Sequence, residues 1–409
     1  MLTPLNPWQI LLATTPLLLT ILVLFLTIWS VIPAPNMTLL PLSVGAPELS
    51  IWLLGGSAIG LVSQVIFRYQ LFPKTLYWVG IGLSIVSLIL NIQPFLQLPA
   101  TIDRANTAMT KALGNNYLAA IPTTVQSTWR SHPFSIAAAL QGIDKPSKIR
   151  IQRHLPFAAP AGTPLTLNLY QPQLPGKYPA VIQIYGGAWR NGSPDSNEEF
   201  SRYLASRGYV VVSIDYRHAP QYHFPAQLID IRTALDYIQQ QAPNWEIDLD
   251  RLAIMGRSAG GHLATLAALQ PDTLPLRAVV SYYGPVDLTA GYDDPPKPDP
   301  IDSRHVLRDF LGGTPTQFPA RYQQASPYQL VDATKQVLPP TLLIYGGQDH
   351  LVEARFGQKM ARKLQSVGTF TVYVEIPWAN HAFDAIFNGP SNQLALYYTE
   401  RFLAYFLQP

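Results

Sequence analysis

The sequence predicts an α/β fold in which a mostly parallel sheet of eight strands carries helices on both faces, preceded by three transmembrane helices. One observation is the distribution of charge, because the first hundred of the 409 residues hold only Glu48, Arg68 and Lys74 as charged side chains. The other is the alternation of short β-rich runs with helical stretches from about residue 148 onward, which is typical of a sheet covered by helices.

These patterns divide the chain into a membrane region at 1–97, a helical linker at 98–146 and an α/β domain at 147–409. The linker is expected to hold short helices at 105–121 and 132–143 that lie on the membrane surface or against the domain. A net charge of +3 without a basic run argues against a nucleic-acid partner. The absence of cysteine excludes disulfides, thiolate nucleophiles and cysteine-bound metals, and we expect no metal and no cofactor.

The three predicted spans are apolar stretches of a length that suits a bilayer, which a helix of roughly 20 residues can cross. They lie at about 8–31, 49–67 and 76–95. The run LLLTILVLFLTIW has no polar face at helical spacing, so a buried helix of a soluble core is disfavoured. A cleaved signal peptide is the alternative for the first stretch, but no Lys or Arg precedes it and no small-x-small cleavage site follows.

The loops between the spans predict the orientation. The second loop, 68–75, carries two positive charges, whereas the first, 32–47, carries none, so the positive-inside rule places the second loop in the cytoplasm. Arg104 and Lys111, which follow the third span, argue in the opposite direction. The sequence therefore predicts an integral membrane protein with an extracytoplasmic α/β domain.

The eight predicted strands fall into two groups. The first two alternate polar and apolar residues, as a half-exposed antiparallel pair does, whereas later runs such as VVVSI are continuously apolar, as in a parallel sheet covered on both faces. The strands are expected at 148–155, 166–172, 178–186, 209–217, 251–256, 277–284, 340–347 and 370–377. Helices are expected at 196–208 and 225–241, and an exposed insertion with a Pro-rich tract at about 289–327.

The stretch GRSAG at 256–260 matches the pattern G-x-S-x-G directly between a predicted strand and a predicted helix. At such a sharp turn the hydroxyl of Ser258 would be exposed at a helix amino terminus, where it can act as a nucleophile. By itself the pattern is equally compatible with a purely structural turn.

A serine nucleophile needs a base to take its proton and an acid to orient the base. Asp349 and His381 each follow a predicted strand, and the chain order Ser, acid, His is the one expected on an α/β sheet. Because the carboxyl ends of parallel strands share one edge, we expect Ser258, Asp349 and His381 to converge there.

Other histidines and carboxylates remain as alternatives. His262 is near the serine in sequence but lies on the following helix, where it is expected to be a supporting residue, and His350 is expected to point elsewhere. Asp287 and Asp384 are the alternative acids.

An oxyanion hole requires backbone N–H groups beside the nucleophile. One is expected from Ala259, the residue after Ser258, and others from the glycine-rich loop IYGGAWRNG at 184–192, in which Gly186, Gly187 and Ala188 let the backbone approach a substrate.

From about residue 150 to its end, the chain resembles an α/β-hydrolase of the esterase/lipase group that includes hormone-sensitive lipase and the bacterial feruloyl-esterase-like and kynurenine-formamidase-like enzymes. The motifs that carry the resemblance are YGGAWRNG at 185–192, DYRHAPQYHFPAQLID at 215–230, GRSAGGHLA at 256–264, YYGPVDL at 282–288, FLGGTP and ASPYQL between 310 and 330, GGQDHLV at 346–352 and NHAFD at 380–384. The resemblance implies Ser258 as nucleophile, His381 as base, Asp349 as orienting acid, and Gly187, Ala188 and Ala259 as oxyanion donors.

The glycine loop departs from the family pattern. The family usually has His-Gly-Gly-Gly, whereas this chain has Tyr185-Gly186-Gly187-Ala188. Alanine keeps the N–H donor but resists a positive φ, and the phenol of Tyr185 either holds the loop by hydrogen bonding or contacts substrate.

The resulting expectation is a membrane-anchored serine hydrolase that cleaves small-molecule or lipid carboxylic esters through an acyl-enzyme. Tyr185, Trp189 and Tyr283 are the expected substrate-binding residues, while Tyr216, Tyr282 and Trp378 belong either to the pocket or to the core. The alternatives are a serine peptidase of the prolyl-oligopeptidase type, whose large amino-terminal domain this chain lacks, and a non-catalytic membrane-bound binding protein.

Overall fold

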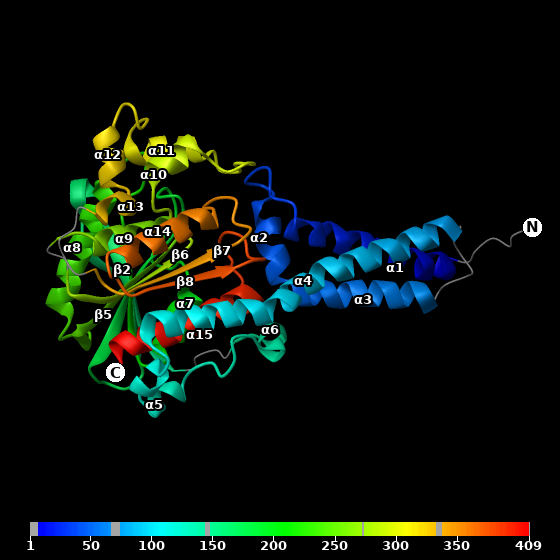
Figure 1. Ribbon diagram of the computed structural model, residues 1–409, viewed down its shortest axis with the longest axis horizontal. Coiled ribbons are helices and arrows are strands. Elements are labelled where there is room, and N and C mark those ends of the chain that lie inside the picture. The colour runs from blue at the N-terminus through cyan, green and yellow to red at the C-terminus, as the bar shows by residue number, and fades with distance from the viewer. Residues whose placement is uncertain (1–6, 67–73, 144–147, 272–273, 333–337, 409) are drawn as a thin grey trace, which may run out of the picture.

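The computed structural model describes residues 7–66, 74–143, 148–271, 274–332 and 338–408. An α/β domain carries a bundle of helices that projects from one side of it (Figure 1). The first turn of α1 lies at the end of the bundle farthest from the domain, and α2 lies where the bundle meets the domain (Figure 1).

All eight predicted strands are present in one sheet with the order β1-β2-β4-β3-β5-β6-β7-β8. They are β1 (Ile149–Ala158), β2 (Leu165–Pro172), β3 (Tyr178–Ile184), β4 (Val210–Ile214), β5 (Ile247–Arg257), β6 (Leu276–Tyr282), β7 (Thr341–Gly346) and β8 (Thr371–Ile376). The pairs β1–β2 and β2–β4 are antiparallel, and all other pairs are parallel. The prediction of a mostly parallel eight-stranded sheet is confirmed.

Helices cover both faces of the sheet because successive side chains of its inner strands point to opposite sides. On β3, Val181 belongs to one core and its neighbour Ile182 to the other. The first core includes residues of α7 (Glu198–Ala205), α14 (Ala354–Ser366) and α15 (Pro390–Leu407), and the second includes residues of α8 (Ala226–Gln241), α9 (Ala259–Ala268) and α11 (Ser303–Leu311). The region expected as an insertion contains α10 (Leu288–Asp293), α11, α12 (Pro319–Gln324) and the start of α13 (Pro327–Leu330).

The bundle consists of α1 (Pro7–Thr27), the short 3₁₀ helix η1 (Ile28–Ser30), α2 (Leu40–Glu48), α3 (Ser50–Ile66) and α4 (Lys74–Leu113). Among the described residues, α4 from Thr75 to Leu113 is the one unbroken helix long and apolar enough to cross a bilayer. The pair α2 and α3 reaches that length only as a single span bent by 79°. The predicted count of three transmembrane helices is therefore not confirmed.

Inside the bundle, polar side chains face one another while apolar side chains face outward. Thr20 and Ser84 share a hydrogen bond of 3.0 Å, and the Gln64 amide donates to Thr20 at 2.6 Å. A second group contains Thr27, Ser57, Ser87 and Asn91. The exposed apolar side chains of α1, α3 and α4 include Leu18, Leu22, Ile59, Val62, Trp78 and Ile89.

The region expected to be a linker is part of the α/β domain. The expected boundary at residue 97 falls within α4, which has 40 residues, and 105–121 is the end of α4 followed by the 3₁₀ helix η2 (Tyr117–Ala120) rather than a separate helix. Met109 is fully buried in the first core, and the Tyr398 hydroxyl donates to the carbonyl of Ile102 at 3.1 Å. The prediction of a separate linker helix was wrong because Ala105, Met109 and Leu113 form one apolar stripe that packs on the domain.

The remaining part of that region is short. It contains α5 (Thr123–Gln126) and α6 (Ile136–Gln141), and α6 corresponds to the helix expected at 132–143. The Ser135 side chain caps α6 by accepting a hydrogen bond from the amide of Ala138.

Candidate active site

Ser258 lies in a sharp turn between β5 and α9. Its backbone has φ +51° and ψ −123°, a conformation that side chains other than glycine rarely adopt, and its amide donates to the carbonyl of Tyr282 at 2.9 Å. The neighbouring glycines allow the backbones to meet: a Cβ at Gly256 would lie 2.1 Å from the carbonyl oxygen of Gly260, and one at Gly260 would lie 2.2 Å from that of Ile184. The packing of this turn therefore requires the two glycines of GRSAG.

The three residues expected to converge are joined in one chain of hydrogen bonds. The Ser258 hydroxyl Oγ lies 2.9 Å from Nε2 of His381, and Nδ1 of His381 lies 2.7 Å from Oδ2 of Asp349. The other carboxylate oxygen of Asp349 accepts the amides of Leu351 and Val352, both at 2.8 Å. Asp349 is thereby held with one oxygen directed at the imidazole, an arrangement that orients a histidine base.

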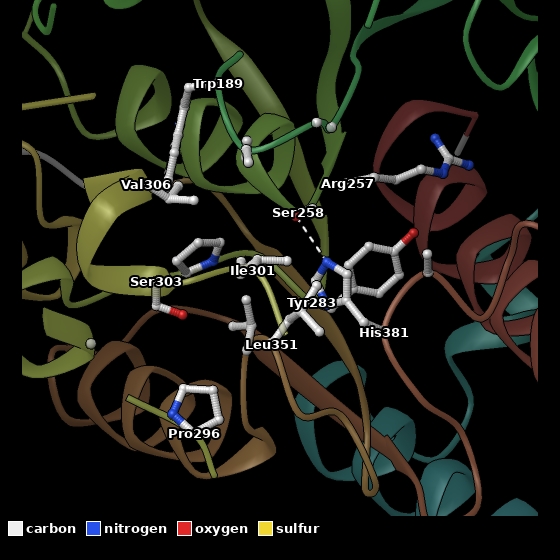
Figure 2. A pocket seen from close by; sticks show the side chains of 18 of the residues that line it. Trp189, Arg257, Ser258, Tyr283, Pro296, Ile301, Ser303, Val306, Leu351 and His381 are labelled. Carbon is white, nitrogen blue, oxygen red and sulfur yellow. Dashed lines mark hydrogen bonds between the residues drawn. The ribbon is translucent and has the colours of Figure 1, made fainter. Parts of the chain in front are cut away.

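His381 is positioned by its neighbours as well as by Asp349. Its amide donates to the side-chain oxygen of Asn380 at 2.8 Å, and the ring of Tyr283 lies with its centroid 4.6 Å from the imidazole. In Figure 2, Tyr283 lies beside His381, and a dashed line marks the hydrogen bond between His381 and Ser258.

The alternative acids have other partners. Asp384 is ion-paired with Arg257 and accepts the Tyr283 hydroxyl, so it contacts the residue before the nucleophile and not His381. Asp287 caps α10 and pairs with Lys359 at 3.1 Å. Burial raises the pKa of the Tyr283 phenol well above its usual range, which keeps this donor protonated.

The glycine loop leaves backbone donors beside Ser258. No hydrogen bond among the described residues uses the amides of Gly187, Ala188 or Ala259. A Cβ at Gly186 would lie 3.1 Å from Cβ of Ser258, which shows how closely the loop approaches the nucleophile. Ala188 has φ +53°, so the alanine adopts the positive φ that it was expected to resist. These free amides fit an oxyanion site.

Tyr185, for which a contact with substrate was one expectation, is not among the residues that line the cavity. Its side chain is fully buried and stacks on Tyr216 with a centroid distance of 4.5 Å. Its hydroxyl donates to Asp215 at 2.5 Å and lies 2.8 Å from Nε2 of His218. Burial raises the pKa of Tyr185 and also that of Asp215, so the phenol stays protonated. The other interpretation of Tyr185, as the residue that holds the glycine loop by hydrogen bonding, agrees with these contacts.

Trp189 and His262 connect the glycine loop to the insertion. Trp189 stacks on Phe310 of α11 at 4.3 Å, and its indole N–H donates to Nδ1 of His262 at 3.2 Å. The opposite nitrogen of His262 then donates to the carbonyl of Ala325 at 2.7 Å, which defines a neutral imidazole. Burial lowers the pKa of His262 to about 4. His262 is a supporting residue, as expected from its place on the helix.

A cavity of about 420 Å³ opens beside the Ser258–His381 pair. This volume is within the range of about 300–1,000 Å³ that small-molecule sites occupy. In Figure 2, Ile301, Val306 and Leu351 surround the space beside that pair. Trp189 and Tyr283 line the cavity, whereas Tyr216, Tyr282 and Trp378 are buried in the core instead.

Sequence reasoning missed two contributions to this site. Met37, which precedes α2, and Leu40, the first residue of α2, line the cavity although they lie in the region expected to be embedded in a membrane. Arg257 also lines it and joins the turn of Ser258 to the loop of His381 through Asp384. The arginine within GRSAG could have been noticed as a charge next to the nucleophile, but its partner is 127 positions away. Among the described residues, no group of three His, Asp or Glu side chains could hold a metal ion.

Comparison with known proteins agrees with this geometry. A family model described as BD-FAE matches residues 167–364. The probable carboxylic ester hydrolase LipM of Mycobacterium tuberculosis is 32% identical over 245 residues, which are 56% of this chain and 55% of LipM. The residues matched by this family model begin in β2 and end in α14, so they lie within the eight-stranded α/β part of the chain.

Solved structures show the same α/β-hydrolase fold. A bacterial heroin esterase has a TM-score of 0.56 and 23% identity, covering 67% of this chain and 89% of its own. The esterase LipW of Mycobacterium marinum has a TM-score of 0.53 and 22% identity, covering 74% and 90%. The chain spans about half the length of the curated relatives it matches.

The buried imidazole of His262 predicts how the stability of the α/β-hydrolase domain depends on pH. Its folded pKa of about 4 lies below the value near 6.5 of an unfolded histidine, so the unfolded state binds more protons at intermediate pH. Stability is therefore lost as pH falls from about 6.5 to 4, by on the order of 3 kcal/mol from this group. Chemical denaturation of the detergent-solubilised protein across this range measures the effect.

The variant His262→Gln should show a smaller change of unfolding free energy over the same pH range, even if its stability at neutral pH is lower. The exposed His132 provides the control, since His132→Gln should leave the pH dependence unchanged. Equal slopes in wild type and His262→Gln would rule out this account of His262.

Proposed function

We propose that this protein is a serine carboxylic-ester hydrolase that works through an acyl-enzyme and is anchored in a membrane. The observation that carries the proposal is the hydrogen-bonded chain from Ser258 through His381 to Asp349 at the wall of an apolar cavity. The names of the curated relatives, which include esterases, agree with this chemistry.

In the proposed first step, Oγ of Ser258 attacks the carbonyl carbon of the ester while Nε2 of His381 takes the hydroxyl proton. The negative charge that develops on the carbonyl oxygen is stabilised by the free amides of Gly187, Ala188 and Ala259. When the tetrahedral intermediate collapses, His381 returns the proton to the leaving alkoxide. The alcohol departs and the acyl group remains on Ser258.

In the proposed second step, His381 takes a proton from water, whose oxygen attacks the acyl-enzyme. The same amides stabilise the second intermediate, and His381 then protonates Oγ of Ser258 as the acid leaves. Throughout, Asp349 accepts a hydrogen bond from the Nδ1–H group of His381 and stabilises the imidazolium that forms at each proton transfer. A non-catalytic binding protein has no need of this alignment, so the alignment favours an enzyme.

A fluorophosphonate probe should label the wild-type protein at Ser258 and fail to label Ser258→Ala, because the probe reacts with an activated serine. Gel fluorescence after incubation of the purified full chain measures this. Labelling that persists in Ser258→Ala would contradict the assignment.

Turnover of p-nitrophenyl esters compared with turnover of aminoacyl amides separates an esterase from a peptidase of the prolyl-oligopeptidase type, and we expect the esters to be preferred.

The variants Asp349→Asn and Asp384→Asn distinguish the two carboxylates near His381. Asp349→Asn should lower kcat by on the order of 10³–10⁴-fold, because an asparagine at this position no longer fixes the tautomer of His381. Asp384→Asn leaves Arg257 buried without its charge partner, so it should lower stability by about 3 kcal/mol with a much smaller change of kcat in the folded fraction. The reverse ranking of kcat would make Asp384 the orienting acid.

The bundle supports the proposal that the protein is embedded in a membrane. In water, a helical bundle is stable with apolar side chains inside, whereas here Thr20, Gln64 and Ser84 bond inside and apolar side chains face outward. In lipid, apolar burial does not hold helices together, and small or hydroxyl side chains that pack closely and share hydrogen bonds do. Gly60 fits this pattern, since a Cβ there would lie 2.7 Å from the Thr20 hydroxyl.

The two positive charges at 68–75 support an extracytoplasmic hydrolase domain. The start of α1 lies at the opposite end of the bundle from that domain (Figure 1), so the two would be on opposite sides of a membrane. Alkaline phosphatase fused at the carboxyl terminus, which is active only outside the bacterial cytoplasm, should be active. If only a reporter that works in the cytoplasm were active at that position, the hydrolase domain would lie in the cytoplasm and the proposed orientation would be wrong.

A further inference from the structure

We propose that the substrate is a neutral amphiphilic ester with a long hydrocarbon chain, which enters the cavity directly from the lipid leaflet on the side of the hydrolase domain. Residues 31–40, which run from the end of η1 to the first residue of α2 and are called the entrance segment below, form the passage for that chain. The inference rests on the proposed ester hydrolase and adds its substrate class and its route of entry.

The cavity is shared between the bundle and the hydrolase domain. Met37 and Leu40 of the entrance segment line the same cavity as Ser258 and His381, which lie more than two hundred positions later in the sequence. Met37 is also 57% exposed, so it lies at the rim and not in the depth of the cavity. A membrane region that served only as an anchor would have no reason to supply part of the active-site wall.

The entrance segment lies at the end of the bundle that meets the domain (Figure 1). It has no charged residue, and Val31, Ile32 and Met37 are each more than two-fifths exposed. An uncharged segment with exposed apolar side chains, directly after a membrane-embedded helix, is expected at the boundary between headgroups and acyl chains. The rim of the cavity is then in contact with lipid.

Contacts of α2, which follows the entrance segment, fix that segment relative to the catalytic residues. The amide of Ser391 donates to the Glu48 carboxylate at 3.0 Å, and the Asn380 side chain donates to the carbonyl of Ser43 at 3.5 Å. Asn380 is the residue that also accepts the amide of His381. In addition, α4 runs without a break from the bundle into the core of the domain, over about 60 Å at 1.5 Å per residue.

The charges of the cavity favour a neutral substrate. Apart from His381, each ionisable side chain of the described lining already has an ion-pair partner: Arg257 with Asp384, Asp287 with Lys359, and Asp294 with Arg355. No Lys or Arg of the described lining is therefore free to bind a carboxylate or phosphate group of a substrate. Leu40, Ile301 and Leu351 of the lining offer apolar contact to a hydrocarbon chain.

The first experiment tests the source of the substrate. The full chain is reconstituted in phosphatidylcholine vesicles that contain a non-exchanging long-chain fluorogenic ester, and the rate is compared with that for the same ester in separate enzyme-free vesicles. Entry from the bilayer predicts an initial rate at least about tenfold higher when enzyme and ester share a membrane, because confinement raises the effective concentration. Equal rates would show that the ester arrives through water and would overturn the proposal.

The second experiment tests the route. Since the chain has no cysteine, Met37→Cys provides a single thiol that a negatively charged methanethiosulfonate reagent can modify before reconstitution. A charge at the rim should lower the ratio of kcat/KM for a long-chain ester to that for p-nitrophenyl acetate by at least about tenfold, because the hydrocarbon chain must pass a desolvated charge. Reduction of the mixed disulfide should restore the ratio, which a folding defect would not do.

The matched control is Leu174→Cys, an exposed apolar side chain in the turn between β2 and β3, at the amino end of β3. Its modification should leave both rates unchanged. An unchanged ratio in fully modified Met37→Cys would overturn the proposed route. Failure of the ester-hydrolase proposal would be visible separately, as absence of both turnover and fluorophosphonate labelling in the unmodified protein.

Discussion

The turn at Ser258 is the constraint on which the active site depends. A serine with φ +51° directly between β5 and α9 is tolerated only because three backbones meet around it, at Gly256, Gly260 and the end of β3. The parallel pairing of β5 through β8 then brings the ends of β7 and β8 to the same edge. Asp349 and His381 follow those two strands, so the sheet itself sets their distance from the serine.

A second constraint couples the bundle to that edge. α4 begins in the bundle and ends with Met109 buried against the sheet, while the arrowheads of β7 and β8 point toward α2 (Figure 1). Hydrogen bonds such as that from Gln64 to Thr20 hold the bundle helices together, and the hydrogen bond from Ser391 to Glu48 joins α2 of the bundle to α15 of the domain. The edge that carries Ser258, Asp349 and His381 therefore faces the bundle, and Met37 and Leu40 line the cavity beside it.

Much of the hydrolase domain was predictable because its signals are local. Each strand is a short apolar run between turn residues, and continuous apolar runs such as VVVSI at 210–214 predict burial on both faces. The course of α4 was not predictable from the apolar stretch at 76–95, because its second half is polar on one side and carries only a narrow apolar stripe. Pro94 and Pro99 lie within α4 without ending it, although proline usually interrupts a helix.

The sequence by itself determined the α/β-hydrolase domain, the turn at Ser258 and the order of serine, acid and histidine, because these depend on residue type and on strand ends. The sequence favoured Asp349 over Asp287 and Asp384 as the acid, and only the tertiary structure shows that Asp349 contacts His381 while the other two contact Lys359 and Arg257. The tertiary structure also shows that Tyr185 is buried beneath the glycine loop and does not line the pocket. It shows as well that Met37 lines the cavity. These outcomes depend on contacts between residues far apart in the chain, which hydrophobic periodicity and motifs do not encode.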